Sequence, residues 1–391
     1  MKTRKLVTLL AAVAASHGVW ATNGTMPHGY GIKAQGMGGV GIALPQDAVA
    51  AANNPAGMVS LGERLDIGLA AVLPNIHADI RGTDFDGGGV KAIPIPELGY
   101  NHMLDARHSV GVSVYGNGVT TKYDANISGG PNSDKDGSNL MQIIISPSFA
   151  MKLDDVNSIG VALNIAYQDF KITGVPDGLG KEDQGHDSSW GYGLKLGWLG
   201  QLTDRLSLGV QYTSKTKMGK LDKYRNLLAG QGEFDIPENY GVGVAFKVTP
   251  ALTVAADYLR INWGDIKSLG NHLTSVGAFG ADNGPGFGWK NQNVARIGLS
   301  YAATASTTLR AGYSHGSQIV PTRDTTLNYL APVTPQDHLT LGGTWAVSPA
   351  AELSAVYGYA IREKVSGSGA STGTDVAMGQ HWIGIAYGMK F

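Results

Sequence analysis

From about Arg64 to the C-terminus, hydrophobic and polar residues alternate along the chain with a period of two. The segment 157–170 places isoleucine, valine, leucine and tyrosine on one face and mostly glycine, alanine, asparagine and glutamine on the other. The same alternation recurs in segments 205–215, 239–248 and 381–391. It predicts β-strands that each have one apolar face.

The pattern predicts about fourteen strands, most of them longer than the five or six residues that are typical of globular proteins. Their polar faces consist of small residues rather than charges. About ten tilted residues cross a bilayer, and apolar-out, polar-in alternation is the signature of a transmembrane barrel. We therefore expect an all-β protein, a transmembrane antiparallel β-barrel. The expected strands are 64–80, 93–103, 107–123, 139–152, 157–173, 188–202, 205–221, 237–248, 251–265, 290–303, 306–317, 336–347, 350–364 and 378–391.

Short and long connections alternate between these strands. Turns such as 105–108 and 154–157 are short, whereas 124–138 and 266–289 are long. Short turns on one side and long loops on the other are the arrangement of outer-membrane barrels. Tryptophans near strand ends are consistent with interfacial aromatic girdles: Trp190, Trp198, Trp263, Trp345 and Trp382.

The N-terminus predicts the compartment. Lys2, Arg4 and Lys5 precede an apolar run from residue 6 to 15, and small residues end at Ala21. This is typical of a secretory signal peptide, 1–21, and the run is too short for a membrane anchor. The C-terminal Phe391 resembles the signature that the outer-membrane assembly machinery recognises. We expect a protein of the outer membrane of a Gram-negative bacterium, with the barrel at 64–391.

Composition excludes some classes of protein. The chain has no cysteine, so disulfides do not stabilise it, and its net charge of −1 offers no electrostatic case for nucleic acid. It has 56 glycines, which help where strands bend or backbones approach closely.

Catalytic and cofactor motifs are also missing. The stretch from Gly36 to Gly41 satisfies G-x-G-x-x-G, but no apolar strand precedes it and Pro45 follows soon after, so a dinucleotide site is not expected. No H-E-x-x-H sequence occurs, and no nucleophile elbow between a buried strand and a helix is expected. The contiguous His186, Asp187 and Ser188 cannot form a triad, because adjacent strand residues point to opposite faces. We expect no enzyme, no cofactor and no metal.

The segment 22–63 lies between the signal peptide and the first strand. It is rich in glycine and alanine and is not strand-like. Because a fourteen-stranded barrel is wider than the eight-stranded ones that side chains fill, its lumen would otherwise be open. We therefore expect this segment inside the barrel, as a plug.

The stretch 29–58, GYGIKAQGMGGVGIALPQDAVAAANNPAGM, resembles the hatch of the FadL/TodX family of outer-membrane transporters for hydrophobic compounds. Its Asn54-Pro55-Ala56, preceded by Asn53, matches the Asn-Pro-Ala motif of that family. The tract 95–124 resembles the second and third strands of the family. The resemblance covers essentially the whole mature chain, although the two tracts carry its specific motifs.

The resemblance implies a passive transporter that takes up long-chain fatty acids or aromatic hydrocarbons. It implies capture in the lumen, rearrangement of the hatch, and lateral exit at a kink in the third strand. The kink corresponds to Tyr115, Gly116, Asn117 and Gly118, and glycines inside a long strand suit a bulge. Glycine could instead simply relieve crowding there, and Asn53 to Ala56 could be an ordinary turn. The expected partners are hydrophobic small molecules, outer-membrane lipid and lipopolysaccharide, and the expected state is a monomer.

A general diffusion porin for polar solutes is the alternative function. It would require an open, charged constriction, whereas this chain has a candidate plug and few charges on its lumen faces. A large steady ohmic conductance would favour the porin.

Several inward-facing residues are candidates for ligand binding. Alternation points Lys195, Arg296 and Arg310 into the lumen, and Asp257 lies on the strand beside Arg296. These charges could form a salt bridge between Asp257 and Arg296, or a desolvated cation could bind a carboxylate head group. Apolar candidates on the face of Asp257 are Leu259, Ile261 and Trp263.

Overall fold

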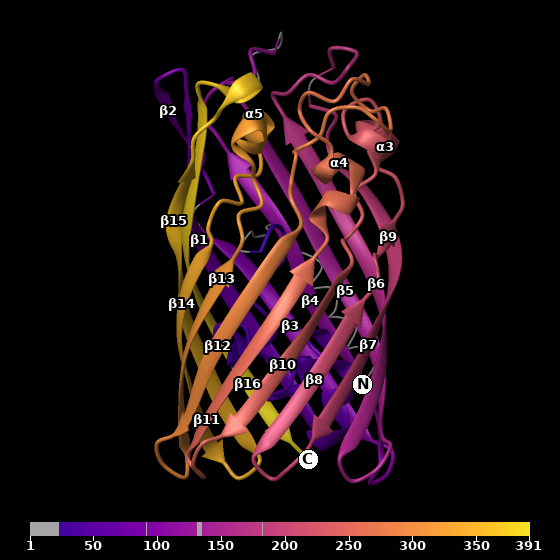
Figure 1. Ribbon diagram of the computed structural model, residues 1–391, viewed down its shortest axis with the longest axis vertical. Helices are drawn as coiled ribbons and strands as arrows, with labels where there is room; N and C mark the ends of the chain where they lie inside the picture. The colour runs from indigo at the N-terminus through magenta and orange to yellow at the C-terminus, as the bar shows by residue number, and fades with distance from the viewer. Residues whose placement is uncertain (1–22, 91, 131–134, 182) are drawn as a thin grey trace, which may run out of the picture.

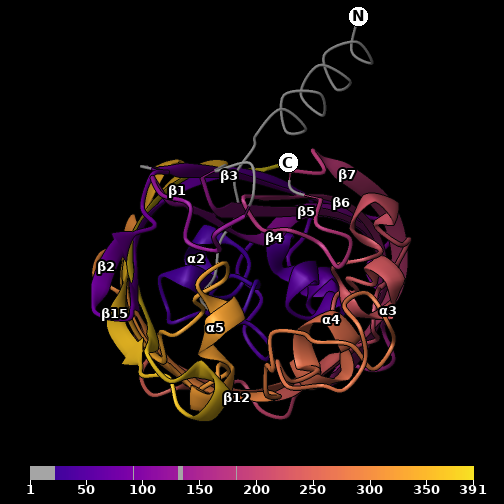
Figure 2. The same ribbon diagram turned by 90° about the horizontal axis from the view of Figure 1, so that it is seen from above.

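The computed structural model describes residues 23–391 except 91, 131–134 and 182. The predicted signal peptide lies outside these residues. Fourteen strands form a closed antiparallel barrel (Figures 1 and 2), and β16 pairs with β1 from Arg64 opposite Lys390 to Ile80 opposite Thr374. The wall strands are β1 (Arg64–Ile80), β3 (Ile93–Met103), β4 (His108–Lys122), β5 (Gly137–Lys152), β6 (Asn157–Thr173), β7 (Asp187–Gln201), β8 (Leu206–Thr213), β10 (Asn239–Lys247), β11 (Leu252–Ile261), β12 (Gln292–Ala302), β13 (Thr307–Gly316), β14 (Asp337–Ser348), β15 (Ala351–Val365) and β16 (Thr374–Lys390).

The predicted fold class is confirmed, and the reason lies in the local alternation of side chains. Outward residues such as Leu163, Ile297 and Ile385 are 42%, 48% and 58% exposed, although they are aliphatic. Inward neighbours such as Asn164 and Gln168 are buried although they are polar. An apolar exterior with a polar interior is stable only where the exterior faces lipid.

Two expected strands are wrong at their outer ends. The strand expected at 205–221 stops at Thr213, because Thr216 turns inward and pairs with Ile236, and β9 (Lys217–Met218) then pairs with β7. The strand expected at 251–265 stops at Ile261, and Trp263 begins the short helix η4 (Trp263–Asp265). Asparagine and glycine on either side of Trp263 favour this turn.

The long loops gather at one end of the barrel and the short turns at the other (Figure 1). The loop end carries the additional strand β2 (Thr83–Asp86) and several short helices. Among the described residues, no helix has both the length and the apolarity needed to cross a membrane. The loop helices are η3 (Asp222–Tyr224), α3 (Ala229–Gly232), η4, α4 (Lys267–Gly270), η5 (Thr322–Asp324), α5 (Thr325–Asn328) and η6 (Gly369–Ser371).

Residues 23–63, the N-terminal segment, lie within the ring of strands (Figure 2). The segment contains α2 (Ile32–Gln35), η1 (Ala48–Ala52) and η2 (Pro55–Ser60), and most of its residues are buried. Apolar side chains such as Met37, Val49 and Met58 are almost wholly hidden from solvent. The segment therefore occupies part of the lumen.

Glycines on the inner face of the wall allow this close packing. A β-carbon on Gly312 would lie 2.0 Å from Gly38 N, and one on Gly99 would lie 2.2 Å from the Ala48 carbonyl carbon. Such distances are too short for any side chain. The high glycine content is thus explained in part by backbone-to-backbone contact between the wall and the N-terminal segment.

Candidate functional site

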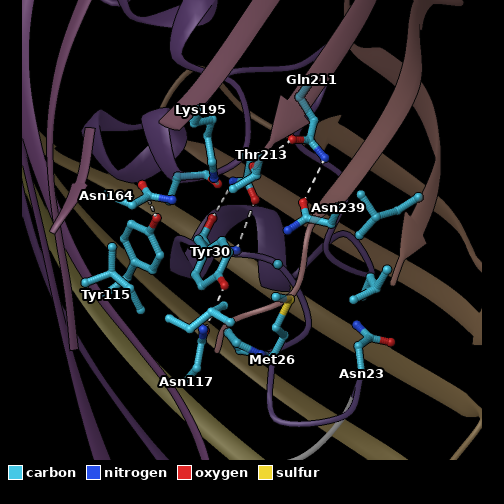
Figure 3. A pocket seen from close by; sticks show the side chains of 18 of the residues that line it. Asn23, Met26, Tyr30, Tyr115, Asn117, Asn164, Lys195, Gln211, Thr213 and Asn239 are labelled. Carbon is cyan, nitrogen blue, oxygen red and sulfur yellow. Dashed lines mark hydrogen bonds between the residues drawn. The ribbon is translucent and has the colours of Figure 1, made fainter. Parts of the chain in front are cut away.

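A cavity of about 50 Å³ lies between the N-terminal segment and the wall (Figure 3). Its lining combines aliphatic and aromatic side chains with uncharged amides and hydroxyls, and two cations reach it. The polar residues labelled in Figure 3 come from both the N-terminal segment and the wall. The lining residues include Asn23, Met26, Tyr30, Asn53, Tyr115, Asn117, Ile144, Asn164, Lys195, Gln211, Thr213, Ile236, Asn239, Leu259, Ile261 and Arg296.

Lys195 projects from β7 into the cavity and is 4% exposed. Its Nζ donates a hydrogen bond to the Ala52 carbonyl of the N-terminal segment. The ammonium lies 5.8 Å from the ring centre of Tyr30 and 5.7 Å from that of Tyr115. It has no carboxylate within 4.0 Å among the described residues, so it remains available to an anionic or π-rich ligand.

Tyr30 also joins the N-terminal segment to the wall. Its hydroxyl donates to Asn117 Oδ1 at 2.8 Å, and its ring lies 4.4 Å from that of Tyr115. Tyr115 in turn donates to Asn164 Oδ1 at 3.2 Å. This chain of contacts fixes the aromatic wall of the cavity.

The cavity brings together Lys195, Arg296, Leu259 and Ile261 from the predicted ligand-binding set. It does not include Arg310, which donates to Gln46 Oε1 at 2.9 Å and to Thr344 Oγ1 at 2.7 Å.

Trp263 is also outside the cavity, since it lies beyond the end of β11 and packs edge-on against Trp289 at 5.3 Å. The expectation that Trp263 continues the strand face of Asp257 is therefore wrong.

Asp257 and Arg296 are cross-strand partners but do not form the expected salt bridge. Asp257 Oδ2 accepts the backbone N–H groups of Gly41 and Ile42 at 2.8 and 3.1 Å. Arg296 Nη1 donates to the Gly39 carbonyl at 3.0 Å. The N-terminal segment offers each charge a backbone partner, and that contact replaces the ion pair.

Carboxylates anchor the N-terminal segment at two further places. Glu97 accepts the N–H groups of Gly31 and Ile32 at 3.1 and 2.9 Å, and Asp66 accepts that of Ala48 at 2.8 Å. These N–H groups lie at the starts of α2 and η1, where a helix leaves its first N–H groups without an intrahelical partner. The segment is therefore held to the wall through its own backbone.

An ion-pair network adds to this anchoring near the short-turn end of the barrel. Glu352 pairs with both Lys33 and Arg64, and Arg64 also forms a two-pronged contact with Asp66. Burial lowers the pKa of Lys33 from its ordinary value, while the charges of Asp47 and Glu352 oppose that shift. The network ties the segment to β1 and β15.

The Asn53-Asn54-Pro55-Ala56 sequence has two different roles in the contacts. Asn53 bonds only within the segment, to the backbone N–H and carbonyl of Tyr30. Asn54 Nδ2 donates to the carbonyls of Ile42 and Trp198, at 2.7 and 3.0 Å. Asn54 thus connects the segment to β7 and also caps η2.

The wall itself is incompletely paired between β3 and β4. β4 pairs with β5 along its whole length, to Lys122, but its pairing with β3 ends at Val114 opposite Leu98. Beyond that point β3 continues to Ile93 with a partner on the β1 side only. The predicted kink residues, Tyr115 to Gly118, begin where this pairing ends.

The N-terminal segment bonds to β4 beside the unpaired stretch. Gly118 has φ 147°, a backbone conformation that side chains rarely allow, and its N–H donates to the Thr25 carbonyl at 2.6 Å. Pro94 and Pro96 stand at alternate positions of β3 and lack N–H donors. Backbone N–H groups at alternate positions of a strand point toward the same edge of that strand. These two prolines therefore suit an edge of β3 that has no partner. They are the sequence signal that could have located the gap.

Comparison with known proteins identifies the family. The profile described as outer membrane protein transport protein (OMPP1/FadL/TodX) matches residues 10–384. The chain belongs to this family.

Solved structures of the FadL/TodX family have the same fold. The P. putida toluene transporter TodX shares 20% identity and a TM-score of 0.74, over 93% of this chain and 99% of that one. The Ralstonia pickettii toluene transporter TbuX shares 19% identity and a TM-score of 0.69, with the same coverage. A Pseudomonas aeruginosa FadL homologue shares 16% identity and a TM-score of 0.70, over 96% and 100% of the two chains. No curated protein sequence gave a match.

Membership of the FadL/TodX family makes this chain a transporter of hydrophobic compounds in the outer membrane of a Gram-negative bacterium. It also orients the barrel, with the long loops outside the cell and the short turns in the periplasm. Proteins of this family are transport channels rather than enzymes. Among the described residues, no group of three or more histidine, aspartate or glutamate side chains could hold a metal ion.

Proposed function

We propose that residues 22–63 act as a hatch, and that hydrophobic compounds leave the lumen sideways between β3 and β4. The observation that carries this proposal is the loss of β3–β4 pairing after Val114, while β4 stays paired with β5 to Lys122. An apolar solute that passes through such a gap enters membrane hydrocarbon without crossing water. No energy source is apparent in the chain, so the movement is passive.

The anchoring of the hatch favours this route over one along the barrel axis. Asp66, Glu97 and Asp257 accept hydrogen bonds from the hatch backbone. The Lys33–Glu352–Arg64 network holds the hatch near the short-turn end of the barrel. An axial route would require all of these contacts to break together. A lateral route requires only the bonds of Tyr30 and Thr25 to β4 to change.

The size of the cavity supports a rearrangement during transport. Its 50 Å³ is about a third of the roughly 150 Å³ that holds a benzene molecule in an engineered apolar cavity. Even a single aromatic ring therefore needs Tyr30, Tyr115 or the hatch to move. A captured molecule would therefore break the hydrogen bond between Tyr30 and Asn117, which connects the hatch to β4 beside the unpaired stretch.

Two classes of substrate fit the cavity lining, aromatic hydrocarbons and long-chain fatty acids. Two of the related structures are toluene transporters, and a third is a FadL homologue. Leu259 and Ile261 provide an apolar surface for either class, and Lys195 or Arg296 would bind a carboxylate. A binding titration with a long-chain fatty acid, its methyl ester and toluene distinguishes them, since only carboxylate recognition separates the acid from the ester.

A reversible cross-link tests the lateral exit. A β-carbon on Gly116 would lie 4.0 Å from Ile95 Cγ2 of β3, so side chains at these two positions meet across the unpaired stretch, and the natural chain has no cysteine. We expect Ile95→Cys with Gly116→Cys to lose uptake of toluene by whole cells when oxidised and to regain it on reduction.

The matched control is Tyr100→Cys with Val112→Cys, which joins the same two strands where they are already paired. Oxidising the control should leave uptake unchanged. If the cross-link at the gap forms completely and uptake persists, the lateral route is wrong.

Two other functions predict different measurements. A general diffusion porin would give a large steady conductance in planar bilayers, whereas a hatch that closes the lumen should give only brief openings. An outer-membrane lipase would hydrolyse lipid or ester substrates, and we expect the purified protein to hydrolyse neither.

A further inference from the structure

The outer rim of the barrel has a notch above β13 and β14. β13 ends at Gly316 and β14 begins at Asp337, and the connection between them folds inward so that Val320, Leu330 and Val333 are buried. β15 continues to Val365, but its pairing with β14 ends at His338 opposite Ala360. Figure 1 shows β15 rising above the ends of these two shorter strands. A groove of about 750 Å³ occupies the notch.

The lengths of the strands place this groove at the level of lipid headgroups. β13 has 10 residues and β12 has 11, which is about the number that a tilted strand needs to cross the hydrocarbon. Both strands reach their outer ends at the lower edge of the groove. Tyr313, which is 39% exposed three residues before the end of β13, suits the boundary between hydrocarbon and headgroups.

All charged residues that line the groove are cations. Lys290 precedes β12, Arg323 lies in η5, and Lys364 is near the end of β15. Lys364 pairs with Asp375 at 2.7 Å, outside the lining. Lys290 has no carboxylate within 4.0 Å among the described residues.

The acidic neighbour of Arg323 is also outside the groove. Asp324, at 3.5 Å from the Arg323 guanidinium, is 1% exposed and also contacts the His272 ring. The uncharged lining combines the buried Val320, Pro321 and Val365 with the polar Gln318, Thr322 and Ser366. The groove therefore combines cations with a partly apolar surface.

We propose that this groove binds the phosphorylated headgroup of an outer-leaflet glycolipid, the lipid A part of lipopolysaccharide. Arginine and lysine are the side chains that bind phosphate best, and among the residues that the structure describes no carboxylate lines the groove to repel it. The apolar part of the lining suits the first carbons of an acyl chain. The site is separate from the transport pathway, so it does not depend on the proposed lateral exit.

Binding of diphosphoryl lipid A to the full-length mature protein in detergent micelles tests this proposal. The variant is Lys290→Gln, Arg323→Gln and Lys364→Gln combined. The control is Arg205→Gln, Lys247→Gln and Lys390→Gln, which removes the same charge from exposed residues at the periplasmic end. Heat-modifiable mobility on gels verifies that both variants are folded.

We expect the groove variant to bind lipid A at least about tenfold more weakly, and the control to bind as the natural chain does. Monophosphoryl lipid A should bind the natural chain more weakly than the diphosphoryl form. Equal binding by the groove variant and the control would overturn the proposal. Equal binding of phosphatidylglycerol, or full displacement by millimolar inorganic phosphate, would refute recognition of the glycolipid in particular.

Discussion

Replacing Asn54 by alanine should loosen the hatch without weakening the barrel. Asn54 is 2% exposed and makes three hydrogen bonds, of which the one to the Trp198 carbonyl reaches the wall. Its removal deprives the buried carbonyls of Ile42 and Trp198 and the N–H of Ala56 of a partner. Each lost bond costs about 1 kcal/mol, and a buried group left without any partner costs about 1–3 kcal/mol.

Only the bond to Trp198 joins the hatch to the wall, so the expected loss of docking free energy is about 1–3 kcal/mol. Since about 1.4 kcal/mol corresponds to a factor of ten, the undocked fraction should rise roughly 5- to 140-fold. The barrel should keep its stability, because β1 and β16 close the wall without any contribution from the hatch.

Two measurements check this expectation. Single-channel recordings in planar bilayers should show more frequent openings, and gels should show unchanged heat-modifiable mobility. Asn53→Ala is the matched control, because Asn53 bonds only to Tyr30 within the hatch. If Asn54→Ala opens no more often than this control, Asn54 does not dock the hatch. If it fails to assemble, the motif is needed for folding rather than for gating.

Three further predictions follow from the contacts inside the lumen and at the C-terminus. Gly312→Ala places a β-carbon 2.0 Å from Gly38 N and should increase channel openings, whereas Gly116→Ala, with no contact shorter than 3.4 Å, should not; equal conductance would show that the wall glycines do not set the position of the hatch. Lys195→Met should weaken binding of a fatty acid by about tenfold relative to its methyl ester, because the buried ammonium has no carboxylate partner among the described residues. Titration measures the two affinities, and an unchanged ratio between them would exclude Lys195 as the carboxylate ligand. Deleting Phe391 should lower the amount of assembled barrel in outer-membrane fractions, and normal assembly would remove its role as a recognition signal.

The sequence by itself determined the class of fold. Alternation of side chains is a property of a single strand, so residues such as Leu163 and Asn164 already indicate which face meets lipid and which meets the lumen. Because each strand reports this independently, the number of strands and the two kinds of connection could be predicted. The inward direction of Lys195, Arg296 and Arg310 followed from the same rule.

The tertiary structure decided what those inward residues meet. Lys195 and Arg310 obey the same alternation, yet one reaches the cavity and the other bonds Gln46 of the N-terminal segment. Asp257 and Arg296 bind the backbone of that segment instead of each other. The position of a long non-strand segment depends on contacts with many strands at once, so no local pattern predicts these partners.

The gap between β3 and β4 could be predicted only in part from the sequence. Pro94 and Pro96 mark in the sequence an edge that cannot donate, but whether a strand lacks a partner depends on the path of its neighbour. The pairing ends at Val114 because β4 follows β5 from there and its Gly118 donates to the N-terminal segment. The two prolines permit an unpaired edge on β3, but only the packing of β4 against β5 and the N-terminal segment determines where the pairing ends.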